Sequence, residues 1–109
     1  MERIYNKLVR DNIPNIIESN GETPVIKVLS SEEYKLELEK KLNEEYNEVI
    51  ESQGRDRLEE LADMLEVIKY LAKVENSTLD EVISISNEKS LKRGAFEKRI
   101  FLEKVIEKN

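Results

Sequence analysis

Apolar residues recur every three or four positions over most of the chain, which predicts amphipathic helices. A capping box at residues 30–33 predicts a long helix over about 31–53, followed by Gly54 as the C′ residue that ends it. Asp56 is a suitable N-cap for a second helix over about 56–75. The short connection between the two helices predicts an antiparallel helix hairpin.

A shorter helix and an extended segment are expected before the hairpin. Pro14 in a first turn and Gly21 just beyond the end predict a short helix. Residues 23–29 alternate and are rich in β-branched side chains, which predicts an extended segment.

A third helix and a tail are expected after the hairpin. A capping box at residues 78–81 predicts a helix over about 78–93 that stops at Gly94. The apolar residues of the tail, 95–109, have no clean period, and we expect this segment to be extended and then helical.

These elements predict an all-α fold, a helical bundle built on the hairpin, in a single domain over residues 1–109. Hydrophobic and charged residues each make up 39% of the chain, and aromatic residues only 6%. Short chains of amphipathic helices are often completed by a partner subunit. We therefore expect a homo-oligomer, with a homodimer as the simplest closed state and a homotetramer as the alternative.

The composition limits the chemistry of any site to carboxylates. The chain has 24 acidic and 18 basic residues, a net charge of −6, and neither histidine nor cysteine. This excludes Ser-His-Asp and Cys-His nucleophile systems, zinc sites with imidazole or thiolate ligands, disulfides and di-iron sites of the Glu-x-x-His type. Oxygen ligands favour a hard cation such as Mg²⁺ or Mn²⁺.

The acidic balance also argues against a nucleic-acid polymer as partner, since such modules carry a basic face. Neither a leader segment nor an apolar run of about 18 residues is present. We expect a soluble, cytoplasmic protein that does not bind a membrane.

Four acidic residues stand out because they fall where an amphipathic helix is normally apolar. On a helical wheel, Glu45 lies inside the apolar arc of the first long helix and Glu48 lies on its border. Glu60 lies inside the arc of the second helix and Asp63 lies on its border. Glu44 points further out.

The four residues are also placed symmetrically about Gly54. Glu48 and Glu60 are each six positions from it, and Glu45 and Asp63 are each nine positions from it. In an antiparallel hairpin, each pair should lie at one height, with about 4.5 Å between the two heights. Buried carboxylates in such a cluster call for divalent cations as counterions. An ion-pair network with Lys41 and Arg57 is the alternative, at a high desolvation cost.

These motifs carry a family resemblance. Glu44-Glu45-x-x-Glu48 followed by Glu60-x-x-Asp63 resembles the signature of the all-α nucleoside triphosphate pyrophosphohydrolase superfamily, which includes MazG-like proteins. The eleven residues between Glu48 and Glu60 are at the short end of the gap in that superfamily. The likeness spans nearly the whole chain, and residues 5–14 and 92–97 resemble a small phosphoribosyl-ATP pyrophosphohydrolase-like branch.

The resemblance implies a Mg²⁺-dependent hydrolase that cleaves a nucleotide between its α and β phosphates, and a role in removing non-standard nucleotides is a theme of the family. It implies Glu45, Glu48, Glu60 and Asp63 as metal ligands. In a chain without histidine, a carboxylate or metal-bound hydroxide must take the proton of the attacking water, and Glu44 and Glu45 are both candidates for the base.

Basic residues are candidates for binding the substrate phosphates: Lys7, Arg10, Lys89, Lys92 and Arg93. The alternative for Lys7 and Arg10 is pairing with Asp11 or with acidic helix faces. Three aromatic residues could stack on a base or pack in the core: Tyr5, Tyr70 and Phe96. Two other functions are open, a non-catalytic helical dimerisation module and a nucleotide-binding regulator without turnover.

Overall fold

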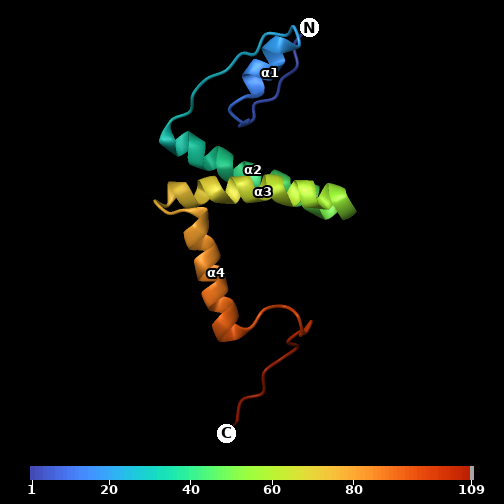
Figure 1. Ribbon diagram of the computed structural model, residues 1–109, viewed down its shortest axis with the longest axis vertical. Helices are drawn as coiled ribbons and strands as arrows, with labels where there is room; N and C mark the ends of the chain where they lie inside the picture. The colour runs from blue at the N-terminus through green and yellow to red at the C-terminus, as the bar shows by residue number, and fades with distance from the viewer. Residues whose placement is uncertain (109) are drawn as a thin grey trace.

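The computed structural model describes residues 1–108, and within them the chain forms helices and no strand. The helices are α1 (Ile13–Ser19), α2 (Ser31–Glu51), α3 (Gly54–Val74) and α4 (Leu79–Arg93). The predicted all-α class is therefore confirmed. Helices α2 and α3 lie side by side as an antiparallel hairpin, with the N-terminal segment on one side and α4 on the other (Figure 1).

The predicted caps explain where two helices begin. The Ser30 hydroxyl accepts a hydrogen bond from the backbone N–H of Glu33 at 3.2 Å, and the Glu33 carboxylate accepts one from the backbone N–H of Ser30 at 3.3 Å. At α4, the Thr78 hydroxyl accepts from the N–H of Glu81 at 3.1 Å, whereas the Glu81 carboxylate accepts from the Ser77 hydroxyl at 2.7 Å. The first capping box is complete, and the second has only its Thr78 half.

The hairpin turn differs from the prediction. Helix α2 ends at Glu51, and Ser52 and Gln53 reverse the chain in extended conformations. Gly54 is not the C′ residue of α2 but the first residue of α3, with φ +60°. Asp56 is not the N-cap, because Gln53 occupies that position and Asp56 lies in the first turn, where its carboxylate meets the positive end of the helix dipole.

The segments outside the helices are long and open. Residues 22–30 form a drawn-out connection between α1 and α2, without a sheet partner in the described part of the chain (Figure 1). The helix expected in the tail is wrong for residues 95–108, which contain no helix, and Asn109 lies outside the described residues. The tail's apolar residues have no helical period and are exposed in the described part of the chain, so they lack the tertiary contacts that would stabilise a helix.

The buried core is small. The buried side chains of the described residues are Leu38 from α2 and Val67 and Ala72 from α3. Helix α4 contributes none. None of the described helices is long and apolar enough to cross a bilayer.

Candidate functional site

The hairpin brings three of the predicted carboxylates together. Glu45 extends from α2, and Glu60 and Asp63 extend from α3. One carboxylate oxygen from each lies within 4.8 Å of the others, and all three residues are half-buried. Oxygen ligands on opposite sides of a Mg²⁺ ion lie about 4 Å apart, so this donor set is close to the spacing that a single hard cation needs.

The predicted symmetry about Gly54 is reflected in the charges that act on these groups. The carboxylate that most strongly raises the pKa of Glu45 is Asp63, and the one that most strongly raises the pKa of Glu60 is Glu48. These are the two pairs expected at equal heights. Glu48 itself is exposed and lies outside the close group of three.

Burial and mutual repulsion disfavour the charged forms of two members. Burial is the main cause that raises the pKa of Glu45, followed by Asp63, while Lys41 opposes the shift. Desolvation is also the main cause for the raised pKa of Glu60, followed by Glu48 and Asp63. A bound divalent cation would remove the free-energy cost of keeping these carboxylates charged, because it supplies positive charge at the point where they converge.

Cations from the N-terminal segment and from α2 partly neutralise the cluster. The Arg10 guanidinium donates to Asp63 at 2.9 Å and to Glu66 at 3.5 Å. Lys41 Nζ lies 3.9 Å from the Glu45 carboxylate. Asp63 thus accepts a hydrogen bond from Arg10 and also belongs to the group of three carboxylates. A metal that binds the same Asp63 oxygen would have to displace Arg10.

The alternative in which Arg57 neutralises the glutamates is not seen, because Arg57 contacts the backbone of the hairpin turn. Its Nε donates instead to the backbone carbonyls of Ser52 at 2.9 Å and Val49 at 3.1 Å. Arg57 therefore supports the hairpin turn by donating to backbone carbonyls at the end of α2.

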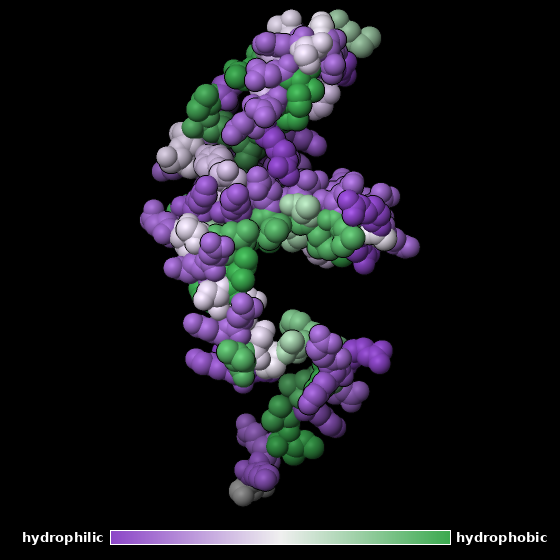
Figure 2. Space-filling model, in the orientation of Figure 1, coloured by the Kyte–Doolittle hydropathy of each residue, from purple (hydrophilic) through white to green (hydrophobic). Residues whose placement is uncertain are grey.

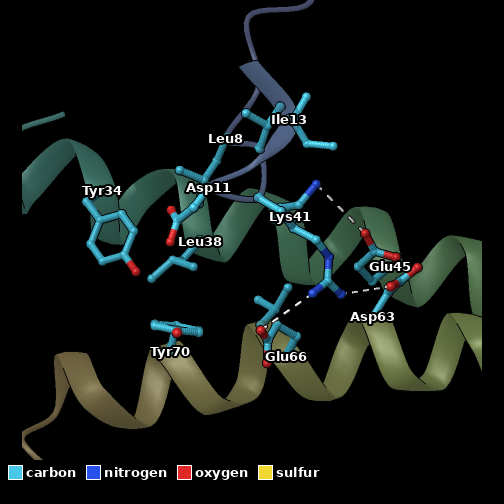
Figure 3. Close-up of a pocket in the computed structure, with 13 residues that line it drawn as sticks. Leu8, Asp11, Ile13, Tyr34, Leu38, Lys41, Glu45, Asp63, Glu66 and Tyr70 are labelled. Carbon is cyan, nitrogen blue, oxygen red and sulfur yellow. Dashed lines mark hydrogen bonds and ion pairs between the residues drawn. The ribbon is translucent and has the colours of Figure 1, made fainter. Parts of the chain in front are cut away.

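A pocket of about 420 Å³ connects the acidic group to two tyrosines. It lies between the N-terminal segment and the hairpin, with Glu45 and Asp63 at one end and Tyr34 and Tyr70 at the other (Figure 3). Leu38 lies on its floor between the two ends. The pocket thus offers an aromatic surface and a polar, charged region to a single elongated ligand.

Tyr34 is an aromatic pocket residue that the sequence pattern did not single out. It shares the apolar arc of α2 with Leu38 and Glu45, and this arc is the signal that could have placed it beside the carboxylates. Burial raises the pKa of Tyr34, with smaller contributions from Tyr70 and Asp11.

Other predicted residues do not reach the pocket within one chain. Glu44 pairs with Lys7 at 3.9 Å, and neither lines the pocket. Tyr5 and Phe96 are exposed. Three basic residues of α4 lie on the opposite side of the hairpin and are exposed: Lys89, Lys92 and Arg93 (Figure 1).

Comparisons with known proteins add little to this site. No family model and no solved structure matches the chain. Over 50 residues, or 46% of the chain, it is 48% identical to an uncharacterized protein of Mycolicibacterium smegmatis (strain ATCC 700084 / mc(2)155). The matched region covers 51% of that relative, so the chain spans about half the length of the curated relative it matches.

The raised pKa values predict how stability depends on pH without metal. Glu45 and Glu60 bind protons more tightly in the folded state than at the ordinary pKa of 4.5, so their charged forms destabilise the fold at neutral pH. Glu60→Gln should therefore unfold at a higher temperature than wild type at pH 7. This advantage should shrink as the pH falls through the raised pKa toward 4.5, as thermal unfolding in EDTA followed by circular dichroism will show.

Glu33 provides a control of opposite sign. The hydrogen bonds from Ser30 lower the pKa of Glu33, so Glu33→Gln should destabilise the fold at neutral pH and matter less in acid. An advantage of Glu60→Gln that stays constant across the pH range would contradict the assigned repulsion.

Proposed function

We propose that this protein is a Mg²⁺-dependent nucleotide pyrophosphohydrolase. The observation that carries the proposal is the convergence of Glu45, Glu60 and Asp63, of which Glu45 and Asp63 line one end of a pocket whose other end has two tyrosines. The motif resemblance to the all-α nucleoside triphosphate pyrophosphohydrolase superfamily supports the same activity. Glu48 is proposed as a fourth ligand, since its charge raises the pKa of Glu60 and the motif resemblance includes it.

The pocket suits a nucleotide in one orientation. Its volume of about 420 Å³ is within the range of roughly 300–1,000 Å³ typical of small-molecule sites. The base would lie against Tyr34 and Tyr70, where stacking stabilises it, and the phosphates would extend toward the carboxylates. Arg10, whose guanidinium already lies at this end, is placed to bind phosphate oxygens when a metal displaces it from Asp63.

The reaction consumes one water and releases a nucleoside monophosphate and pyrophosphate. A bound Mg²⁺ would supply the positive charge that lets phosphates approach the carboxylates, and it would lower the pKa of a coordinated water. Glu45 is favoured over Glu44 as the proton acceptor, because Glu45 lines the pocket whereas Glu44 pairs with Lys7 outside it.

A panel of nucleoside triphosphates, assayed with and without Mg²⁺, tests the proposal. We expect at least one nucleotide to give monophosphate and pyrophosphate in equal amounts, and EDTA to stop the reaction. Release of orthophosphate would contradict cleavage between the α and β phosphates. Nucleotide binding without turnover would indicate a regulator, and the absence of both Mg²⁺ and nucleotide binding by calorimetry would indicate an interaction module.

A further inference from the structure

The pocket has a middle region between its acidic end and its tyrosine end, and Asp11 lies there. Asp11 lines the pocket and is itself exposed, so a ligand can reach it. Its neighbour in the chain, Arg10, reaches the acidic end, where it donates to Asp63. The negative charge of Asp11 instead acts on Tyr34 and contributes to the raised pKa of that phenol. Figure 3 shows the Asp11 carboxylate between Tyr34 and the acidic end, directed toward Leu38 on the pocket floor.

The two cations expected from the sequence to pair with Asp11 are engaged elsewhere. Lys7 lies 3.9 Å from the carboxylate of Glu44, and Arg10 pairs with Asp63 and Glu66. Within residues 1–108, the Asp11 carboxylate has no ion pair or hydrogen bond, and it lies outside the group of three carboxylates that converges for a metal. Its two oxygens are therefore available to accept hydrogen bonds from a ligand.

The covalent order of a nucleotide places its sugar at this position. With the base against the tyrosines and the phosphates at the acidic end, the sugar lies between them. The adjacent 2′ and 3′ hydroxyls of a ribose are hydrogen-bond donors, and an acidic residue binds the ribose of NAD in this way in dinucleotide-binding folds. Figure 2 shows largely hydrophilic surface where the N-terminal segment meets the hairpin, which suits a polar group such as a sugar.

We propose that Asp11 selects ribonucleotides over deoxyribonucleotides. One of its carboxylate oxygens accepts a hydrogen bond from the 2′ hydroxyl, and the other accepts one from the 3′ hydroxyl. The inference rests on the proposed function, since it assigns the sugar of the same substrate. The negative charge of Asp11 also repels phosphates, so the triphosphate lies at the other end of the pocket.

Matched nucleotides that share a base test the assignment: ATP and dATP, GTP and dGTP, CTP and dCTP, and UTP and dUTP. For each base that the wild-type protein hydrolyses, we expect kcat/KM to be at least about 10-fold higher for the ribonucleotide, the low end of the effect of a hydrogen bond to a charged group. The 3′-deoxy analogue of the preferred nucleotide should be disfavoured as well, because it too leaves one carboxylate oxygen without a donor. Asp11→Ala should make the ribonucleotide and deoxyribonucleotide values nearly equal.

The ratio of the two values distinguishes sugar binding from a structural role of Asp11. A distorted pocket would lower both values of a pair together and leave their ratio unchanged. Asp11→Asn keeps the shape of the side chain and one acceptor oxygen, so its ratio should lie between those of wild type and Asp11→Ala. Glu18→Gln is the matched control, because Glu18 is an exposed acidic residue of α1 that does not line the pocket, and its ratio should equal that of wild type.

Each contrary outcome has a distinct meaning. Equal kcat/KM for ribonucleotides and deoxyribonucleotides in the wild type would overturn the assignment and leave the proposed hydrolysis intact. A ratio that neither Asp11→Ala nor Asp11→Asn changes would overturn it as well. A changed preference among bases at a constant ratio would overturn it in favour of a contact between Asp11 and the base. The absence of both hydrolysis and binding for every nucleotide would overturn the proposed function, and this inference with it.

Discussion

Glu60→Gln and Asp63→Asn are each expected to reduce Mg²⁺-dependent pyrophosphate release by at least about 100-fold. Loss of an outer-shell partner already costs about 10–100-fold in metal sites, and these residues are proposed as direct ligands. The helical circular dichroism should be unchanged, because neither carboxylate is part of the buried core. Steady-state kinetics and Mg²⁺ titration calorimetry on the same samples measure the two effects.

Glu59→Gln is the matched control for these variants. Glu59 is the neighbour of Glu60 on α3, but its side chain is 66% exposed and lies 3.9 Å from Arg55. Its removal subtracts one negative charge from the same helix without removing a proposed ligand, so activity should be close to that of wild type. Full activity in any two of the four ligand variants would contradict the metal assignment; these are Glu45→Gln, Glu48→Gln, Glu60→Gln and Asp63→Asn.

The sequence was informative about the acidic site because helical periodicity is a local property. Wheel positions placed Glu45 and Glu60 on the apolar faces, and the symmetric spacing about Gly54 paired them with Asp63 and Glu48. Both conclusions tolerate an error of one or two residues in the turn. The chain reverses at Ser52 and Gln53 rather than at Gly54. The pairs of interacting carboxylates are nevertheless those that the symmetry predicts.

The position of Arg10 could not be read in the same way. Its contact with Asp63 joins residues 53 positions apart and depends on how the N-terminal segment lies over the hairpin. No periodicity specifies that arrangement. Pairing with an acidic helix face was an open alternative for Arg10, and that contact is present, whereas phosphate binding by Arg10 stays a prediction.

The helix expected in the tail failed for a related reason. Helices shorter than about 12–15 residues gain most of their stability from tertiary packing. In the described chain, Phe96, Ile100 and Phe101 are 99%, 80% and 86% exposed, so nothing in the hairpin provides that packing. Local sequence cannot specify the structure of a segment whose partner surface is on another element or another chain.

Leu38→Ala is expected to lower the free energy of unfolding by about 2–5 kcal/mol, the range for truncating a buried leucine. Leu38 is 4% exposed and is the buried residue that α2 contributes to the hairpin seam. Few side chains share this core, so neighbours cannot easily collapse into the space that the truncation leaves. Urea unfolding in EDTA at one fixed protein concentration measures the loss, because metal binding or association would otherwise shift the apparent stability.

Leu36→Ala separates burial from helix propensity. Leu36 lies one half-turn away on α2 and is 58% exposed, so its truncation removes the same atoms from the same helix without opening a cavity. Alanine is also the better helix former, and the variant should stay within about 0.5 kcal/mol of wild type. If Leu38→Ala were no more destabilising than Leu36→Ala, the α2–α3 seam would not be the core. The carboxylates would then lose the rigid support that holds Glu45 opposite Glu60 and Asp63, since both helices present them from that seam.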